Sequence, residues 1–487
     1  MATPDDPVIE QDKPDPKMDR SRDVSRLSRH SYLAGLAGVV TVMGMGYLGA
    51  RRGVFKAVEG GASGVVHGWR VLGGGDADMN LSMAFVLLVC SAVMFAVELA
   101  IRFDVDRGKL IKLSPLLEEG RHASFLLECV QVYLAELALL FVILGFYRTA
   151  GEYGFRNNGQ GYYKPWFAVM NTFFSIYLYG GMPYVLLTRA LQYAPRSDRR
   201  QAAFTVIKTV RRLVARLRRV DQETLEALPA FDRYDKSALL GLLVKLFFVP
   251  LMTVFFGDQF SHLVKNYEWM LGDGFKLSNV NLRDVHNVSH SVIFAIDVGL
   301  AWCGYVVSSR WIKNTLFSTE PTWEGWTVAL LCYPPINRTL GVYYSAPPED
   351  AFFAIPNPTV VAFFAILSIL SFTVYTSATV MFGLRFSNLT HRGIITTGPY
   401  ALVRHPAYAS KNFSWWCVML PYALYEIYLG RPWATRDWSS CLPVLGMMIM
   451  SGIYYRRALT EEQHLSRDAE YRIYMKKVPY RFIPGVL

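Results

Sequence analysis

The chain has 487 residues, of which 52% are hydrophobic and 18% are charged, and its formal net charge is +11. Soluble domains contain about 25% charged residues, so this deficit and the positive mean hydropathy of +0.22 exclude an ordinary soluble enzyme and indicate a polytopic membrane protein. The six cysteines show neither metal-ligand spacing nor the pattern of a secreted disulfide framework.

The first 190 residues are predicted to form a polar tail and a bundle of membrane spans. Residues 1–31 are polar, contain four prolines and end in a cluster of arginines, as is typical of a disordered cytoplasmic tail. Four apolar runs of about the length that crosses a bilayer follow. They cover residues 32–50, 81–101, 124–146 and 166–187. We therefore predict an N-terminal transmembrane bundle over residues 32–190.

A basic segment, residues 191–236, separates this bundle from the next spans. Between Arg189 and Arg219 the chain has ten Lys and Arg residues against one acid. Apolar residues recur there every three or four positions, which predicts an amphipathic cytoplasmic helix on an anionic membrane surface. They are Ile207, Val210, Val214 and Leu217. No nucleic-acid-recognition fold accompanies the charge, so we expect no nucleic-acid partner.

Residues 237–357 are predicted to hold two central spans, near 239–256 and 285–307, and one broken segment. The broken segment, 322–344, is interrupted by Pro334-Pro335, so it either re-enters the membrane or crosses it as a broken span. We expect it to cross, because a crossing places the basic C-terminal flanks on the cytoplasmic side with the tail and the basic segment.

Ionisable residues inside the predicted spans are candidates for function or for buried pairing. His286, His290 and Asp297 have spacings that place them on one helix face. Polar packing between helices is the favoured interpretation, since two histidines and one distant carboxylate are a weak metal set, and we expect no metal site. Glu98, Glu128 and Glu136 raise the same question, and pairing with Lys245 is one explanation for them.

The last segment, residues 358–487, contains spans near 360–384, 413–429 and 442–455. A motif rich in Gly, Pro and Tyr, Gly398–Tyr408, precedes the last two spans, and a charged stretch, Arg456–Tyr474, follows them. The two spans should form a helical hairpin that brings both polar stretches to one membrane face. The predicted fold is thus an all-α integral membrane protein of about nine or ten transmembrane helices.

These C-terminal motifs resemble a known family. The order Gly-Pro-Tyr, Arg-His-Pro-x-Tyr, Glu-Glu-x-x-Leu, Tyr-x-x-Tyr and Val-Pro-Tyr-Arg is similar to that of the isoprenylcysteine carboxyl methyltransferases, which in turn resemble the phospholipid methyltransferases. The resemblance covers roughly the last hundred residues. It implies that residues 358–487 form a methyltransferase core that uses S-adenosylmethionine and methylates a lipid or lipid-linked acceptor.

The resemblance also implies roles for individual residues. The catalytic candidates are Arg404, His405 and Glu462, and the cofactor-binding candidates are Tyr400, His405, Pro406, Tyr408, Glu461, Glu462 and Tyr471. Carboxylates can accept hydrogen bonds from a ribose diol or an ammonium, a guanidinium can pair with a carboxylate, and tyrosine faces attract a sulfonium. His405 could deprotonate a thiol acceptor, whereas a carboxylate acceptor needs no base and an amine also remains open.

The chain departs from the family pattern after the first motif, where Ala409-Ser410 replaces the usual glycine and Lys411 follows. One alternative is a sterol-reductase-like enzyme that uses NADPH, since such enzymes share the Arg-His-Pro-x-Tyr corner and the Val-Pro-Tyr-Arg ending. Another is a transporter or lipid-handling protein without enzymatic activity. In each case we expect an integral protein, such as one of a bacterial inner membrane, with its N-terminus and catalytic face in the cytoplasm and with a homodimer as one possible assembly.

Overall fold

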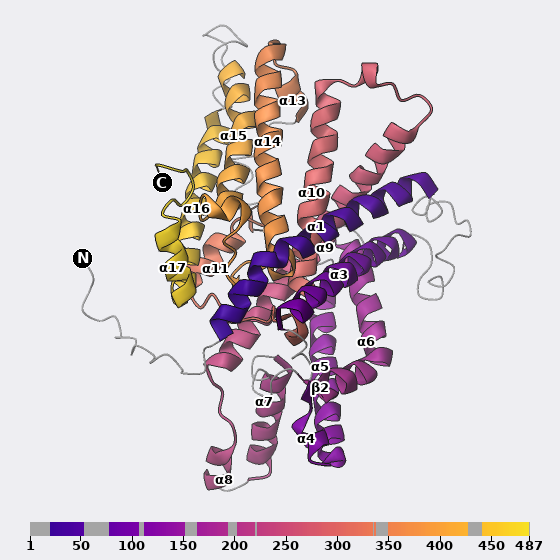
Figure 1. Cartoon of the computed structure of the whole chain (residues 1–487), viewed down its shortest axis with the longest axis vertical. Coiled ribbons are helices and arrows are strands. Elements are labelled where there is room, and N and C mark those ends of the chain that lie inside the picture. Colours follow the sequence, from indigo (N-terminus) through magenta and orange to yellow (C-terminus); the bar gives the residue numbers. More distant parts are fainter. Residues whose placement is uncertain are drawn as a thin grey trace, which may run out of the picture.

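The computed structural model describes residues 20–52, 77–106, 112–150, 163–192, 202–219, 222–334, 336–337, 349–426 and 441–486. Helices dominate these residues, and the strands that the described part contains are two antiparallel pairs of two residues each. β1 (Lys112–Leu113) pairs with β2 (Leu191–Gln192), and β3 (Ser318–Thr319) pairs with β4 (Thr390–His391). The predicted all-helical fold class is confirmed (Figure 1).

The helices fall into long and short groups. The long helices are α1 (Arg20–Arg52), α3 (Ala77–Asp106), α5 (His122–Thr149), α6 (Lys164–Ala190), α9 (Arg233–Leu271), α10 (Leu282–Val306), α14 (Pro358–Phe382), α15 (Pro406–Leu424) and α16 (Cys441–Leu465). The short helices are α4 (Pro115–Glu118), α7 (Ala202–Leu217), α8 (Gln222–Ala227), α11 (Trp323–Leu330), α13 (Glu349–Phe353) and α17 (Ala469–Lys477). The single 3-10 turns are η5 (Leu277–Asn279), η6 (Arg310–Ile312), η7 (Gly383–Arg385) and η8 (Gly398–Ala401).

Six helices in the described part of the chain are long and apolar enough to cross a membrane. They contain the segments Ser28–Arg51, Met83–Phe103, His122–Thr149, Tyr234–Leu271, Leu282–Val306 and Pro358–Arg385. An integral membrane protein is therefore indicated, with six such spans where the sequence predicted nine or ten. The other predicted spans coincide with α6, α15 and α16, which are helical but outside this set. In α16 the apolar part is short, because Arg456 and Arg457 interrupt it.

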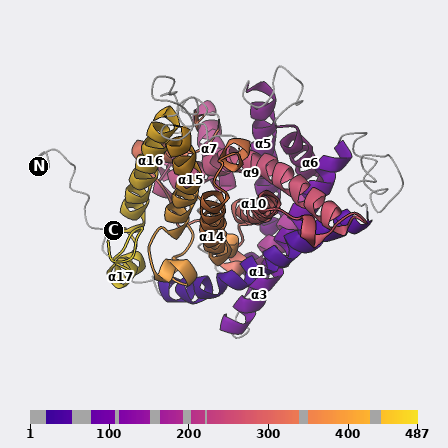
Figure 2. The same ribbon diagram turned by 90° about the horizontal axis from the view of Figure 1, so that it is seen from above.

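α10 lies at the centre of the bundle, and 72% of its most apolar stretch is buried. A capping box fixes its start, since Asn281 accepts from the backbone of Asp284 and the Asp284 side chain accepts from the backbone of Asn281. Its buried second half includes Trp302, whose indole donates to Thr253 of α9 at 2.9 Å. Seen from above, α9, α14 and α1 surround α10, and α15 and α16 lie beyond α14 (Figure 2).

The predicted tail of residues 1–31 overlaps a helix, because α1 begins at Arg20. Residues 1–19 lie outside the described part. Tertiary hydrogen bonds hold the early turns of α1, where the Ser28 hydroxyl donates to the Ile394 carbonyl at 2.9 Å and the Arg385 guanidinium donates to Ser31 at 2.8 Å. The start of α1 therefore packs against the residues that follow α14.

The described elements that flank the broken segment lie at opposite ends of α10. Before it, β3 follows η6, which comes directly after the C-terminal end of α10. After it, Phe353 of α13 packs edge-on against His286 near the start of α10, with ring centroids 5.4 Å apart. Of the segment's Pro-rich part, Pro335 and residues 338–344 lie outside the described residues. The chain therefore passes from one end of α10 to the other between β3 and α13, and the membrane crossing expected for this segment stays a prediction.

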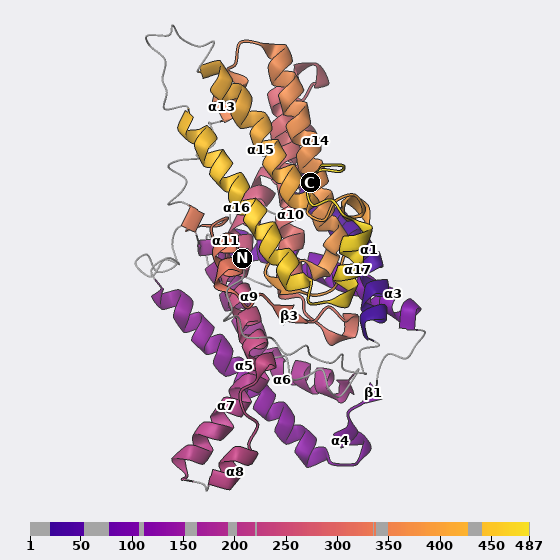
Figure 3. The ribbon, with the colours of Figure 1, turned by 90° about the vertical axis from the view of Figure 1, so that its left-hand side faces the viewer.

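Three parts of the chain meet at the same end of the bundle. Thr319 of β3 donates to the Ser237 carbonyl near the start of α9, at 3.1 Å. β3 also lies beside the end of α16, where the Ser318 hydroxyl and His464 are 3.2 Å apart. The start of α9, which follows the basic segment, therefore shares this end with the C-terminal motifs (Figure 3). The hairpin of α15 and α16 runs away from it, and residues 427–440, which connect the two helices, lie outside the described residues.

Close helix contact at Gly35 gives a first testable prediction. A Cβ atom at this position would lie 2.0 Å from the Val380 carbonyl oxygen of α14, whereas a Cβ at Gly44 of the same helix would meet nothing within 4 Å. Gly35→Ala should therefore lower the thermal midpoint of the detergent-purified protein, because α1 and α14 must separate. Gly44→Ala should leave the midpoint unchanged or raise it, since alanine is favoured over glycine in a helix by about 1 kcal/mol. Equal midpoints for the two variants would contradict the packing of α1 on α14.

Candidate active site

The two C-terminal motifs meet where α15 begins and α16 ends, as the sequence predicted. Pro406 occupies the first turn of α15, where its missing N–H leaves no helical hydrogen bond unmade. α15 begins there, seven residues before the predicted start of the span at 413. The two residues before it bind the C-terminal segment, since the backbone amide of Arg404 donates to the Tyr480 carbonyl at 3.0 Å and that of His405 donates to the Arg481 carbonyl at 2.9 Å.

Glu462 is the centre of a buried ionic cluster, the Glu462 cluster, made of Glu462, Arg404, His405 and Arg481. Glu462 Oε1 accepts from Arg404 Nε at 2.7 Å and lies 3.1 Å from His405 Nε2, and Oε2 accepts from Arg481 Nη2 at 2.8 Å. Arg404 Nη1 also donates to the carbonyls of Val478 and Pro479. Arg404 Nε and Nη1 thus donate to groups of the chain itself. Arg404 and Glu462 therefore hold the C-terminal segment in place.

The electrostatics of Glu462 follow from these contacts. Burial alone would raise the pKa of the Glu462 carboxyl, but the hydrogen bonds from His405, Arg481 and Arg404 outweigh it and hold the pKa well below its usual range. The carboxylate is therefore ionised whenever the cluster is formed.

This lowered pKa predicts how the cluster responds to acid. A carboxyl whose pKa is lowered by folding stabilises the folded state above its unfolded pKa of about 4.3, and this stabilisation is lost as the pH falls below that value. Hydrogen exchange of residues 478–486, corrected for intrinsic rates, should be constant from about pH 7 to pH 5 and accelerate below about pH 4. In Glu462→Gln the protection should be low throughout and independent of pH. A transition near pH 6 that persists in this variant would contradict the prediction.

Glu461 differs from its neighbour because its side chain is 40% exposed. Its Oε2 accepts from the Tyr408 hydroxyl at 2.6 Å and lies 4.0 Å from His405 Nδ1. The Tyr408 ring stacks on the His405 imidazole, with centroids 5.3 Å apart and planes 7° apart. The Glu461 carboxylate is therefore accessible to a ligand. It lies beside the stacked rings of His405 and Tyr408, and the Glu462 cluster holds the His405 ring in place.

Arg457 is a site residue that the sequence did not single out. Its guanidinium lies 5.0 Å from the centre of the Tyr408 ring and 5.9 Å from that of Tyr454, and it donates to Asn388 at 2.5 Å. The Arg457 guanidinium thus lies over the face of the Tyr408 ring, and the Glu461 carboxylate binds the Tyr408 hydroxyl. The sequence could have indicated Arg457, because it lies one helical turn before Glu461 and residues four apart are neighbours on a helix surface.

Tyr400 and Tyr471 have packing roles in this structure. The Tyr400 ring meets Phe382 edge-on, and its backbone carbonyl accepts from the Tyr474 hydroxyl at 2.7 Å. Tyr471 is buried beside Tyr474, Ile394 and Val478. The Tyr400 carbonyl thus binds α17, and Tyr471 packs α17 against Ile394.

The intramembrane residues predicted to share one face of α10 separate into two environments. His286 and His290 stack on each other, with centroids 5.6 Å apart, and His290 also packs against Phe372. Asp297 instead accepts from the hydroxyls of Tyr375 and Thr379 of α14. No group of three possible metal ligands occurs among the residues that the structure describes. The contacts agree with the polar packing that the sequence favoured.

The three acidic residues of the N-terminal spans are paired, but not with Lys245. Glu98 lies 3.5 Å from Arg385, Glu128 contacts Arg189, and Glu136 accepts from the Tyr177 hydroxyl. The explanation through Lys245 was therefore wrong, because cations and hydroxyls on other helices lie against these carboxylates.

Comparisons of the chain with protein-family models, with curated proteins and with solved structures find no match. The function proposed below therefore depends on the geometry at the junction of α15, α16 and the C-terminal segment.

Proposed function

We propose that the protein is a membrane-embedded methyltransferase that uses S-adenosylmethionine and acts on a lipid or lipid-linked acceptor. The observation that supports this best is the meeting of the two motifs at Tyr408, whose hydroxyl donates to Glu461 at 2.6 Å. That contact joins the Arg-His-Pro-x-Tyr motif to the Glu-Glu motif, as the resemblance to the isoprenylcysteine carboxyl methyltransferases requires. The catalytic face would be cytoplasmic, on the side of the basic segment.

The chemistry of the residues fits the cofactor. Its amino-acid end carries an ammonium and a carboxylate, and the site offers Glu461 for the first and Arg457 for the second, on either side of Tyr408. The ribose diol is a second group that Glu461 could bind. When bound, S-adenosylmethionine supplies an electrophilic methyl group on a sulfonium. Arg404 and Glu462 act as positioning residues in this proposal, since they bind each other.

His405 is oriented for one proton-transfer role. Its Nε2 lies 3.1 Å from the Glu462 carboxylate, so in the neutral ring this nitrogen carries the hydrogen and donates a hydrogen bond to Glu462. Nδ1 then remains as the acceptor, on the side of Glu461. A thiol acceptor would give its proton to Nδ1, whereas a carboxylate acceptor would leave the ring as a positioning group.

The acceptor side is proposed to lie towards Lys411. The Tyr408 ring packs against Tyr454, and Tyr454 packs against Trp415, with centroids 5.5 and 5.9 Å apart. The Lys411 ammonium lies 5.3 Å from the centre of the Trp415 ring and 5.1 Å from that of Tyr375. This row of rings leads from Glu461 to a cation of α15 that also lies over Tyr375 of α14, and that cation could bind an anionic acceptor group.

A methyl-transfer assay tests the proposal. Purified protein with methyl-labelled S-adenosylmethionine should label a component of a bacterial membrane lipid extract, and Glu461→Gln should reduce the rate by at least about tenfold through loss of a charge-assisted hydrogen bond. Glu324→Gln is the matched control, because Glu324 is exposed and pairs only with Arg456 among the described residues. The proposal fails if the rate is unchanged in Glu461→Gln or if no lipid component is labelled.

A further inference from the structure

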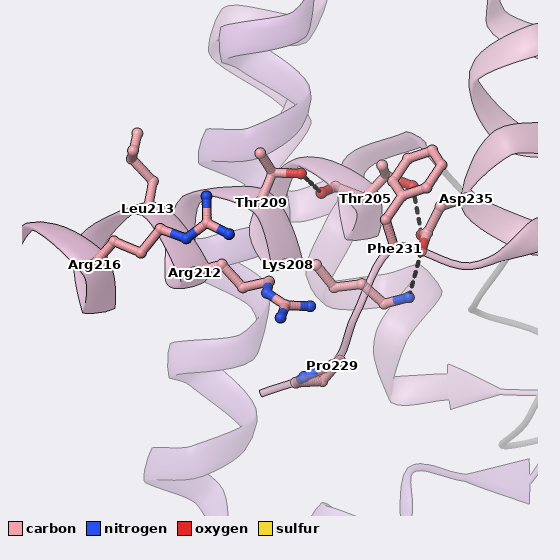
Figure 4. A pocket seen from close by; sticks show the side chains of 9 residues that line it. All are labelled: Thr205, Lys208, Thr209, Arg212, Leu213, Arg216, Pro229, Phe231 and Asp235. Atoms are coloured by element: carbon pink, nitrogen blue, oxygen red, sulfur yellow. Dashed lines mark hydrogen bonds and ion pairs between the residues drawn. The ribbon is translucent and has the colours of Figure 1, made fainter. Parts of the chain in front are cut away.

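A second feature lies in the basic segment, apart from the proposed active site. A pocket of about 490 Å³ opens between α7 and the residues that lead into α9 (Figure 4). Its lining residues are Thr205, Lys208, Thr209, Arg212, Leu213, Arg216, Pro229, Phe231 and Asp235. The volume is in the range of ordinary small-ligand pockets. Three of the lining side chains are cations and one is an acid.

The one acid is committed to the lysine. Asp235 is fully buried, and it accepts from Lys208 Nζ at 2.7 Å and from the Thr205 hydroxyl at 2.8 Å. Asp232 adds a second carboxylate 3.4 Å from Lys208 Nζ. Lys208 is therefore already neutralised, and these contacts fix the wall of the pocket.

The two arginines are different. Within the described part of the chain, neither Arg212 nor Arg216 has an ion pair or a hydrogen bond to its side chain, and no dashed line reaches either guanidinium in Figure 4. Both come from α7, one helical turn apart, and Figure 4 shows the Arg212 guanidinium pointing towards Pro229 and the Arg216 guanidinium lying beside Leu213. The pocket thus has two uncompensated positive charges suited to an anion.

Apolar side chains lie next to these charges. Leu213 is 54% exposed and Phe231 is 58% exposed, although both line the pocket. Leu217, one turn further along α7, is 74% exposed. A site for a free inorganic anion needs no such apolar surface, whereas a lipid presents a charged headgroup and hydrocarbon together.

The position of the pocket agrees with a membrane surface. It adjoins the start of α9, and α7 packs on the first half of α5 through the hydrogen bond from Arg211 to Gln131, at 2.6 Å. α5 and α9 are both candidate membrane spans. The pocket therefore lies at the start of one candidate span and beside the first half of another, within the segment that carries the excess of basic residues.

We propose that this pocket binds the phosphate of an anionic phospholipid headgroup, with Arg212 and Arg216 as the binding cations and with Leu213 and Phe231 against the hydrocarbon. The site is distinct from the proposed methyltransferase site, and binding there is independent of methyl transfer. Its occupant is a membrane lipid that anchors α7 at the bilayer surface.

Dioctanoyl phosphatidylglycerol, which disperses in water, is the probe. Its affinity for the full-length protein in a neutral detergent should be measured by thermophoresis, with dioctanoyl phosphatidylcholine in parallel. Arg212→Gln/Arg216→Gln should weaken binding by roughly 10- to 30-fold, at about 1 kcal/mol for each basic residue near the surface. Arg218→Gln/Arg219→Gln is the matched control, since it removes the same charge from the same segment outside the pocket. It should change the affinity less than about twofold, because both side chains are exposed outside the pocket, where salt screens their charges.

Each other outcome overturns the proposal. Equal losses in the two double variants would mean attraction by the whole basic segment, and equal affinity for phosphatidylcholine would mean hydrophobic binding alone. Competition by inorganic phosphate at the concentration of the lipid would mean a site for a free anion. Thermal midpoints of both double variants show whether each is folded. We expect both to fold, because all four arginines lie at the surface of α7 or just beyond it.

Discussion

Hydrogen exchange at the amides of Arg404 and His405 should accelerate by roughly 100-fold when Glu462 is replaced with alanine. These amides donate to Tyr480 and Arg481, so they report whether the C-terminal segment stays on the first motif. Glu462→Ala leaves two guanidiniums and an imidazole around an empty position, and removing one partner of a buried ion pair costs about 3–5 kcal/mol. A local opening equilibrium shifted by about 3 kcal/mol corresponds to that acceleration.

Glu461→Ala is the control for this experiment, because it removes the same side chain one position earlier. Glu461 is 40% exposed and makes its hydrogen bond to Tyr408 at the edge of the cluster. Its loss should cost less than about 1 kcal/mol, so exchange at Arg404 and His405 should change less than about fivefold. If the two alanine variants exchange alike, Glu462 does not hold the C-terminal segment.

The second large effect is expected far from the proposed site, at Glu98. This carboxylate of α3 is fully buried 3.5 Å from the Arg385 guanidinium, which also donates to Ser31 of α1 and to the carbonyl of Lys313. Glu98→Ala leaves Arg385 as an uncompensated buried cation where α1, α3 and η7 meet, at a cost of about 3–5 kcal/mol. We expect little folded protein in the membrane, measured as the monodisperse fraction after extraction in detergent.

Glu324→Ala is the matched control for Glu98→Ala. Glu324 also pairs with an arginine, Arg456, but the two side chains are 49% and 57% exposed. Exposed ion pairs contribute about 0–1 kcal/mol, so this variant should be extracted like the wild type. Normal yield and thermal midpoint for Glu98→Ala would show that the pair between α3 and η7 does not stabilise the bundle.

Much of the arrangement near the C-terminus could be predicted from the sequence. Two apolar runs joined by a short polar connection form a hairpin, and a hairpin returns Glu461 and Glu462 to the residues that precede its first helix. The period of the basic segment likewise predicted α7, because apolar residues at every third or fourth position are visible in the chain itself. Patterns of this kind are local, so they need no knowledge of which helices become neighbours.

The contacts of each side chain were beyond the sequence, because they depend on which helices pack together. Arg404 was expected to bind a ligand carboxylate, but Glu462 and the carbonyls of Val478 and Pro479 occupy three of its hydrogen bonds. Arg481 lies in a recognised motif, yet its pairing with Glu462 follows only from the path of the C-terminal segment.

Burial also separates residues that the chain places side by side. Adjacent carboxylates on a helix point in directions about 100° apart, so Glu462 faces the Arg404 guanidinium while Glu461 reaches the surface. Asp297 and His290 lie in different environments on the same helix. Asp297 binds the hydroxyls of Tyr375 and Thr379 of α14, and His290 does not.

Titration calorimetry of the detergent-purified protein with S-adenosylhomocysteine, with NADPH in parallel, tests the central claim most directly. The claim is that Glu461 is the ligand-facing carboxylate of a methyltransferase site. It predicts binding of S-adenosylhomocysteine that is weakened about 10- to 100-fold in Glu461→Gln, and no comparable binding of NADPH. Binding of NADPH alone, or an affinity for S-adenosylhomocysteine that is the same in the wild type and in Glu461→Gln, would contradict it.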